Sequence, residues 1–211
     1  MAKGFFKAAV FALFLAGLSA GAYAQITVSG GFALSSVSGI EMSGYGANID
    51  SSVGFGGNVY LDYLLPVSIP LSLGVEAGFD TGSFSVTYSG TKYDETIMAI
   101  PLLLRVAYHF DLFPKLDLYL VGKIGYAFGI WTGSYRDMVD MTGYDVDTIG
   151  GLAFGFDAGV AYYFTSHMGL FIEAGFDDYM LETKISSSAG YAETLKAPFN
   201  RFVTVGLSTK F

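Results

Sequence analysis

Five charged residues interrupt the apolar, alternating segments of this chain: Glu76, Arg105, Lys123, Asp157 and Glu173. Each lies at a similar distance from a short connecting segment, so adjacent strands would bring all five to one height. A charge removed from water is costly unless an opposite charge compensates it. We therefore expect three carboxylates and two cations to pair in the interior and to fill it. An ion path or a gate at the same height is the alternative.

Acid-base and nucleophilic catalysis have little support in the sequence. The chain has two histidines, His109 and His167, and both lie beside short connections. A catalytic triad needs a nucleophile, a base and an orienting acid within hydrogen-bond reach, and the spacing around either histidine does not supply them. We expect His109 to lie at the rim of the interior and His167 to be a turn residue. We predict that the protein is not an enzyme.

Metal, cofactor and nucleic-acid sites are not expected either. The absence of cysteine excludes disulfides, thiolate metal ligands and a cysteine nucleophile. Segment 135–147 is rich in aspartate but lacks the ligand order of a calcium loop, so a solvated acidic loop is expected there. The formal net charge of -8 provides no cationic surface for a nucleic-acid backbone.

The first 24 residues have the pattern of a secretory signal peptide. Two lysines precede the apolar run 8–18, and small residues then lead to an A-x-A site formed by Ala22 and Ala24. Cleavage is predicted before Gln25. An anchor helix that is retained is the weaker alternative, because the run is shorter than the roughly 20 apolar residues that a spanning helix needs. The domain organisation is then a signal peptide, 1–24, and one barrel domain, 25–211.

The charged residues need elements to position them, and the sequence predicts strands. Hydrophobic residues make up 52% of the chain and charged residues 14%, well below the roughly 25% charge of a soluble domain. Apolar residues alternate with small or polar ones at a period of two. The eight segments with this pattern are 25–36, 53–65, 71–80, 102–110, 118–128, 152–164, 169–178 and 199–211.

The connections between these segments alternate in length. Short ones are expected at 66–70, 111–116 and 165–168, and long ones at 37–51, 82–95, 132–148 and 180–197. This arrangement is typical of an all-β, up-and-down antiparallel transmembrane barrel with short periplasmic turns and long external loops. Both mature termini would then be periplasmic. Aromatic girdles are expected from Tyr63, Tyr108, Phe110, Tyr162, Tyr163, Phe164 and Phe211.

A soluble β-sandwich is the alternative to the barrel. Its second face would be charged, whereas here the second face is rich in glycine and alanine. Two residues fit the strand pattern poorly. Pro101 removes a ladder donor, so we expect a bulge or a break in pairing there. Arg201 is expected to face outward near the loops, where a lipid head group or snorkelling accommodates its charge.

Three stretches resemble the small outer-membrane β-barrel families grouped with OmpA, OmpX, OmpW and the opacity-type adhesins. They are Ile100 to Arg105, Leu118 to Tyr126, and the ending from Asn200 to Phe211. The resemblance implies an integral outer-membrane location in a diderm bacterium. It also implies contacts with outer-membrane lipids and, during biogenesis, with the barrel-assembly machinery and periplasmic chaperones. A terminal Phe preceded by outward apolar residues looks like the assembly signal of these families: Val203, Val205, Leu207 and Phe211.

Three functions are weighed for such a barrel, and a lipid-modifying enzyme has the least support of the three. The preferred one is a non-enzymatic surface protein with a filled lumen, serving a structural or adhesive role through four external loops and an extracellular ligand. The alternative, implied by the OmpW likeness, is a narrow channel for small or hydrophobic solutes.

Overall fold

The computed structural model describes residues 25–37, 40–42, 48–51, 53–88, 90–187 and 192–211. The expected signal peptide, with Ala22 and Ala24, lies outside the described residues. Eight long strands form the protein: β1 (Gln25–Val37), β4 (Val53–Leu64), β5 (Leu71–Tyr88), β6 (Thr91–Phe113), β7 (Leu116–Gly133), β9 (Ile149–Tyr163), β10 (Met168–Ser187) and β11 (Ala192–Lys210). Smaller elements are β2 (Glu41–Met42), β3 (Asn48–Ser51), α2 (Ser134–Met141) and β8 (Tyr144–Val146).

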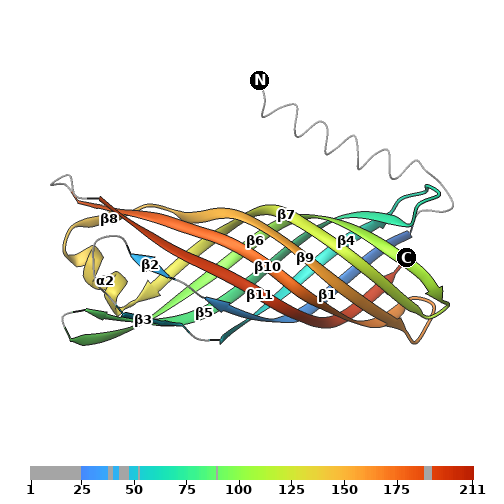
Figure 1. Cartoon of the computed structure of the whole chain (residues 1–211), viewed down its shortest axis with the longest axis horizontal. Coiled ribbons are helices and arrows are strands. Elements are labelled where there is room, and N and C mark those ends of the chain that lie inside the picture. Colours follow the sequence, from blue (N-terminus) through green and yellow to red (C-terminus); the bar gives the residue numbers. More distant parts are fainter. Residues whose placement is uncertain (1–24, 38–39, 43–47, 52, 89, 188–191) are drawn as a thin grey trace, which may run out of the picture.

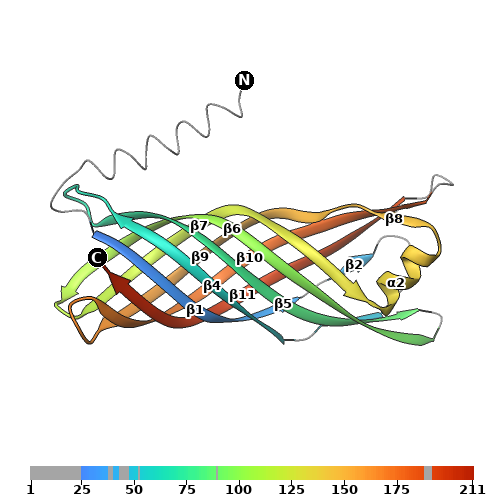
Figure 2. The same cartoon turned by 180° about the vertical axis from the view of Figure 1, so that it is seen from behind.

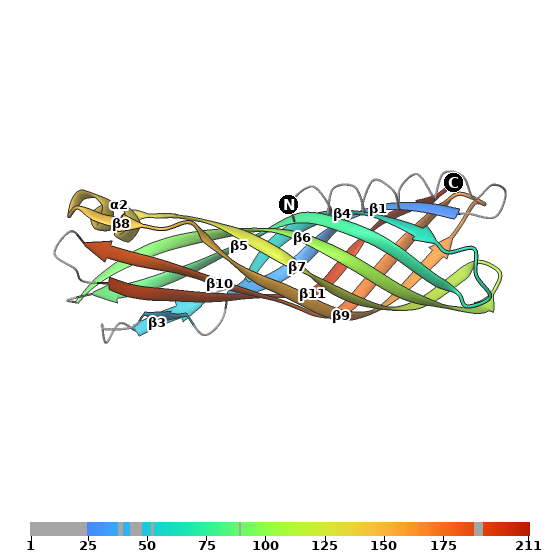
Figure 3. The same cartoon turned by 90° about the horizontal axis from the view of Figure 1, so that it is seen from above.

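The eight long strands close into an antiparallel ring. Their order is β11, β1, β4, β5, β6, β7, β9 and β10, and β10 pairs again with β11. The expected eight-stranded, up-and-down barrel is confirmed, and Figures 1 and 2 show its elongated shape. Figures 1 and 3 show α2 and β8 at one end, which we call the loop end. The C-terminus lies at the opposite end with the short connections, which we call the turn end. In the described part of the chain, no helix is long and apolar enough to cross a membrane.

The outer wall between the two ends is apolar and exposed. On β1, the Phe32 side chain is 85% exposed, and on β4 Val53 and Phe55 are also exposed. Outward rows of the same kind follow the other strands: Leu102, Leu104, Val106, Leu120, Ile124, Phe156, Leu170, Ile172, Val205 and Leu207. A water-soluble monomer rarely exposes a contiguous apolar patch above a few hundred Å². The wall therefore requires an apolar solvent.

The alternation reverses toward the loop end. On β5 the inward side chains become apolar, with Phe84 and Val86 buried, while Ser83 and Thr87 face outward and are exposed. The same reversal on the other strands produces one buried core, which includes Val37, Ile97, Trp131, Ile149, Tyr179, Leu181, Leu195 and Phe199. A polar outside around an apolar inside is the pattern of a protein in water. The strands thus continue beyond the apolar belt.

This reversal corrects the expected loop lengths. Segments 82–95 and 180–197 were expected to be long loops, but they are mostly strand: β5 and β6 pair from Leu71 to Tyr88, and β10 pairs with β11 as far as Ser186. Segment 132–148 contains α2 and β8. A strand that leaves lipid keeps its period of two but exchanges its faces, so the end of the outward apolar row does not mark the end of the strand.

The ladder is irregular at several places, two of which bear on the predictions from the sequence. Around Pro101, β5 and β6 keep one register but lack pairs between Ala77–Leu102 and Asp80–Ala99. Pairing is therefore interrupted there, without a register shift. The bulge lies instead on β11, where the register with β1 changes between Val203 and Arg201.

Two side chains that the sequence predicts on the outer face lie on the inner face of the barrel. Because Phe202 is the extra residue, the alternation shifts by one and Arg201 faces inward, 2% exposed. The outward placement predicted for Arg201 is wrong. Tyr163, expected in an aromatic girdle, also faces inward, where its hydroxyl lies 3.1 Å from Ser208 Oγ. Its neighbour Tyr162 faces outward.

Candidate functional site: the charged lumen

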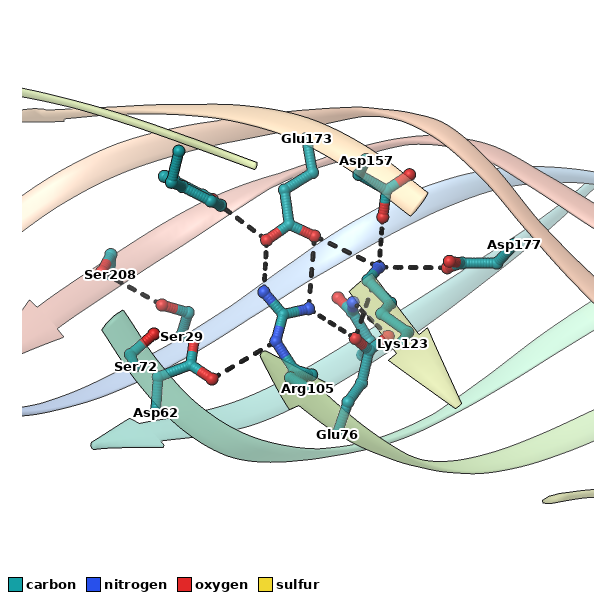
Figure 4. Close-up of polar contacts among 12 residues, drawn as sticks. Ser29, Asp62, Ser72, Glu76, Arg105, Lys123, Asp157, Glu173, Asp177 and Ser208 are labelled. Carbon is teal, nitrogen blue, oxygen red and sulfur yellow. Dashed lines mark hydrogen bonds and ion pairs between the residues drawn. The ribbon is translucent and has the colours of Figure 1, made fainter. Parts of the chain in front are cut away.

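The five charged residues singled out in the sequence come from five adjacent strands and meet inside the barrel. Glu76 lies on β5, Arg105 on β6, Lys123 on β7, Asp157 on β9 and Glu173 on β10. All five are buried and all lie at the level drawn in Figure 4. The ladder explains the common height, because Arg105 pairs directly with Lys123 across β6 and β7.

Arg105 occupies the centre of this level. Its guanidinium lies 2.6 Å from Glu76 and 2.6 Å from Glu173, and its Nε lies 3.4 Å from Asp62 Oδ1. The guanidinium carbon also stacks 3.8 Å from the ring centroid of Tyr60. With 1% of Arg105 exposed, bidentate and stacked contacts of this kind replace its hydration.

Lys123 forms a second centre beside Arg105 (Figure 4). Its ammonium lies 2.5 Å from Asp157 and 3.1 Å from Asp177, with Glu173 at 3.4 Å. A compact ammonium with three donors can satisfy several carboxylates at once. Glu173 thus joins the two centres, since it contacts both cations.

Arg201 completes the group from β11. Its Nη2 contacts Glu76 and lies 2.5 Å from Asp177 Oδ2. The eight residues joined by these ion pairs are called the lumen cluster: Asp62, Glu76, Arg105, Lys123, Asp157, Glu173, Asp177 and Arg201.

Three members of the lumen cluster were not among the predicted site residues. Arg201 was missed because a bulge cannot be read from alternation. Asp177 had a visible signal: it follows Glu173 by four residues in a segment that nearly repeats the one from Glu76 to Asp80. Positions four apart on a strand face the same side. Asp62 stands on the inward row of β4 and pairs across the ladder with Gly74.

Inward glycines make room for these carboxylates. Asp62 lies opposite Gly74, and Asp177 lies opposite Gly155. A Cβ at either glycine would overlap the carboxylate of its partner. The second face of the strands is therefore rich in glycine because acidic side chains lie flat across the neighbouring backbone.

The lumen cluster carries five carboxylates against three cations. Asp80 lies beyond it toward the loop end, and its carboxylate accepts a hydrogen bond from the Tyr179 hydroxyl at 3.1 Å. Fully ionised, the interior is thus negative and would favour cations over anions. Within the described ranges, no group of histidine, aspartate or glutamate is placed to hold a metal ion.

At the turn end, three side chains from three strands form a hydrogen-bonded string. Ser72 Oγ lies 3.0 Å from His109 Nε2, and His109 Nδ1 lies 2.8 Å from Asp117 Oδ1. A hydroxyl, an imidazole and a carboxylate follow one another in this string, as they do in a serine triad. The sequence spacing does not reveal it, because β5, β6 and β7 each contribute one residue. Lys210 Nζ also lies 3.2 Å from Asp117.

This string lacks features that acyl transfer requires. Ser72 is 2% exposed, and it pairs with Leu64 on one side and Ala107 on the other. Ladder pairing engages the backbone N–H groups that would otherwise stabilise an oxyanion. The string instead satisfies polar groups at the turn-end rim. His167, as expected, lies in the connection between β9 and β10, with Nδ1 3.0 Å from the Lys210 carbonyl oxygen.

A buried acid organises the loop end. Glu95 accepts a hydrogen bond from Trp131 Nε1 at 2.9 Å and another from the Arg136 backbone N–H at 3.3 Å. The second bond satisfies a backbone N–H in the first turn of α2, where such groups have no partner within the helix. Val139 of α2 joins the buried apolar core. These contacts fix α2 to the barrel and add to the filling of its loop end.

The residues proposed as an assembly signal lie on the outer face of β11 and just beyond it. Val205 and Leu207 are exposed and Val203 is partly exposed. Phe211 is also exposed, while its backbone N–H donates to the Ile26 carbonyl at 2.8 Å. The last residue thus closes against the first strand.

Comparisons with known proteins agree with this architecture. The family model described as outer membrane protein beta-barrel domain matches residues 10–211. The outer membrane protein OprG from Pseudomonas aeruginosa is similar at 16% identity and TM-score 0.57, over 89% of this chain and 95% of that chain. A major outer membrane protein from Thermus thermophilus has 16% identity and TM-score 0.58, over 90% of this chain and 100% of that chain. No curated protein matches the sequence. At such identities, the structural likeness shows the fold, and a fold does not decide the activity.

Proposed function

Because the chain belongs to the outer membrane protein β-barrel domain family, we propose that it is a non-enzymatic surface barrel whose lumen is filled with side chains. Its roles are to reinforce the membrane and to present the loop end to an extracellular ligand. The apolar outer wall and the family match together indicate an integral protein of the outer membrane.

The filled lumen is the observation that supports this proposal. The lumen cluster occupies the membrane-spanning part, and the buried apolar core with α2 occupies the loop end. An eight-stranded barrel is just wide enough for side chains to fill it. Two successive layers, one charged and one apolar, would each oppose the passage of a hydrated solute. Binding then has to take place on the outside, and the loop end exposes polar residues such as Ser83 and Thr87.

Orientation and biogenesis belong to the same proposal. The short turns and both mature termini are periplasmic, and the loop end is extracellular, as in barrels of this type. The barrel-assembly machinery would recognise the outward apolar residues of β11 and the terminal Phe211. Periplasmic chaperones would bind the unfolded chain before assembly.

A narrow channel is the second candidate. The excess of carboxylates in the lumen cluster would favour small cations, whereas hydrophobic solutes would meet buried charge. This second function would require the cluster to rearrange, since the ion pair between Arg105 and Glu173 at 2.6 Å and the one between Arg201 and Glu76 already join strands across the lumen.

Planar-bilayer recording of the refolded protein separates the two functions. A filled barrel should produce no discrete conductance steps in potassium chloride at moderate voltage. Repeated steps of one size, present in every preparation of folded protein, would favour the channel and remove the main support for the proposal.

A further inference from the structure

One acidic side chain of β10 stands on the lipid-facing side of the barrel. Along this strand Asp177 and Tyr179 are buried in the lumen, whereas Phe176 and Met180 are exposed on the outer wall. Asp178 lies between them on the outer face, because side chains alternate along a strand. An ionisable side chain on a lipid-facing surface is costly and therefore calls for a partner.

Asp178 belongs to a polar row that crosses three strands. It pairs with Asn200 on β11, and Asn200 pairs with Ser36 on β1. All three residues are partly exposed. On the turn-end side of the row, Phe202 and Leu34 are exposed and belong to the apolar outer wall. The row thus marks the loop-end border of that wall, which is the level of lipid head groups.

The carboxylate of Asp178 has no compensating group in the described part of the chain. The adjacent Asp177 has ion pairs to Lys123 and Arg201 in the lumen, whereas no described cation lies within ion-pair distance of Asp178. Its Oδ1 is buried in the wall, and no described group donates a hydrogen bond to this atom. A carboxylate that is partly withdrawn from water needs a positive charge beside it. That charge has to come from outside the chain.

We propose that the row of Asp178, Asn200 and Ser36 binds the ammonium head group of a membrane lipid. The ammonium lies against the Asp178 carboxylate, and the acyl chains lie on the apolar wall toward the turn end. The site adds recognition of one kind of head group to the general contact between barrel and membrane. It does not depend on whether the lumen conducts.

Aromatic neighbours favour an ammonium over a metal ion. Phe154 on β9 pairs directly with Asp178, and Phe176 lies two residues before it on the same face. The face of an aromatic ring attracts an organic cation. A calcium or magnesium ion instead requires several oxygen ligands, and the row contains one carboxylate. Consistently, the described residues contain no group of histidine, aspartate and glutamate that could hold a metal ion.

Glu182 provides a matched control on the same strand. It follows Asp178 by four residues, so it lies on the same face, and it is exposed. Across the ladder it pairs with Lys196, which is also exposed. Glu182 therefore carries the same charge as Asp178 but lies beyond the apolar wall and beside a cation of the chain. Its removal should not affect lipid binding.

Native mass spectrometry in a maltoside detergent with EDTA tests the proposal. The refolded protein is mixed with equal amounts of phosphatidylethanolamine and phosphatidylglycerol, which carry the same acyl chains and phosphate and differ in the amine. The parent should prefer phosphatidylethanolamine at least about tenfold. Asp178→Asn removes the charge and keeps the shape, so it should abolish the preference, whereas Glu182→Gln should retain it. Heat-modifiability on gels verifies that each variant is folded.

Equal retention of the two lipids by the parent overturns the proposal. So does a preference that Asp178→Asn and Glu182→Gln change by the same factor, because the effect would then come from the general negative charge of the surface. Retention of phosphatidylglycerol that appears only when calcium replaces EDTA also overturns it, since a divalent cation would then bridge the carboxylate and the phosphate. Conductance in planar bilayers is measured separately, so failure of the filled-lumen function does not affect this result.

Discussion

Removing the Arg105 guanidinium should destabilise the barrel strongly. Arg105 contacts three carboxylates, at 2.6, 2.6 and 3.4 Å, and is 1% exposed. In Arg105→Ala the excess of negative charge in the lumen cluster rises from two to three, and Asp62 loses the ion pair that the structure gives it. Breaking a buried pair by removing one partner costs about 3–5 kcal/mol. Water entering the vacated space would place the cost near the lower end of that range.

Two further variants separate charge from volume. Arg105→Met removes the same charge but retains most of the side-chain volume, so it should destabilise the protein similarly while the lumen stays filled. Arg105→Ala also opens the constriction and makes it more negative, so only this variant should begin to pass cations. Lys184→Ala, at an exposed site on β10, is the control and should alter neither property.

Equilibrium unfolding in urea, with the protein in detergent or lipid, measures the stability of each variant. Planar-bilayer recording measures whether it conducts cations. If Arg105→Ala and Arg105→Met unfold at the same urea concentration as the parent, the ion pairs of Arg105 do not stabilise the barrel. The physical account of the lumen cluster would then be wrong.

Export, assembly, orientation and chemistry can each be tested separately. Mass spectrometry of the mature protein should find Gln25 at the N-terminus, and an intact N-terminal methionine in the outer-membrane fraction would refute cleavage. Deleting Phe211 should lower the heat-modifiable fraction in cells, because the assembly signal is lost; an unchanged fraction contradicts that role. A tag at the hairpin tip, 88–91, should be accessible on intact cells, whereas one in 113–116 should be hidden, and the opposite pattern would reverse the orientation. A fluorophosphonate probe should not label Ser72 in the folded protein, since its hydroxyl is buried; stoichiometric labelling would reveal a reactive serine.

The number of strands and most of the residues that face the lumen were predictable because both depend on local alternation. A period of two assigned Glu76, Arg105 and Glu173 to one side of their strands. The short connections then placed them at one height. Each prediction needed only neighbours in the sequence and the constant rise of a strand.

The features that were missed depend on contacts between distant segments. The inward position of Arg201 follows from one extra residue, Phe202, in the pairing with β1. Nothing local marks this bulge in the sequence. The string from Ser72 to Asp117 requires three strands in register, so its spacing along the chain carries no motif.

Strand length was underestimated for a different reason. The predicted strand 71–80 assumes one polarity, with apolar residues outside, and therefore ends at Asp80, where that polarity stops. Phe84 and Val86 continue the alternation with the opposite polarity, because the surrounding solvent changes from lipid to water. An exchange of faces at constant period is therefore a sequence signal for a barrel that extends beyond the membrane.

If the charged side chains of the lumen form one connected network, Arg105 and Glu173 should be energetically coupled, and a double-mutant cycle between them measures that coupling. The cycle compares the free energies of unfolding of the parent, Arg105→Met, Glu173→Gln and the double variant. Because the two groups lie 2.6 Å apart in a buried site, their coupling energy should be about 1–3 kcal/mol. A coupling within about 0.5 kcal/mol of zero would mean that the two side chains do not interact, and the connected network would be contradicted.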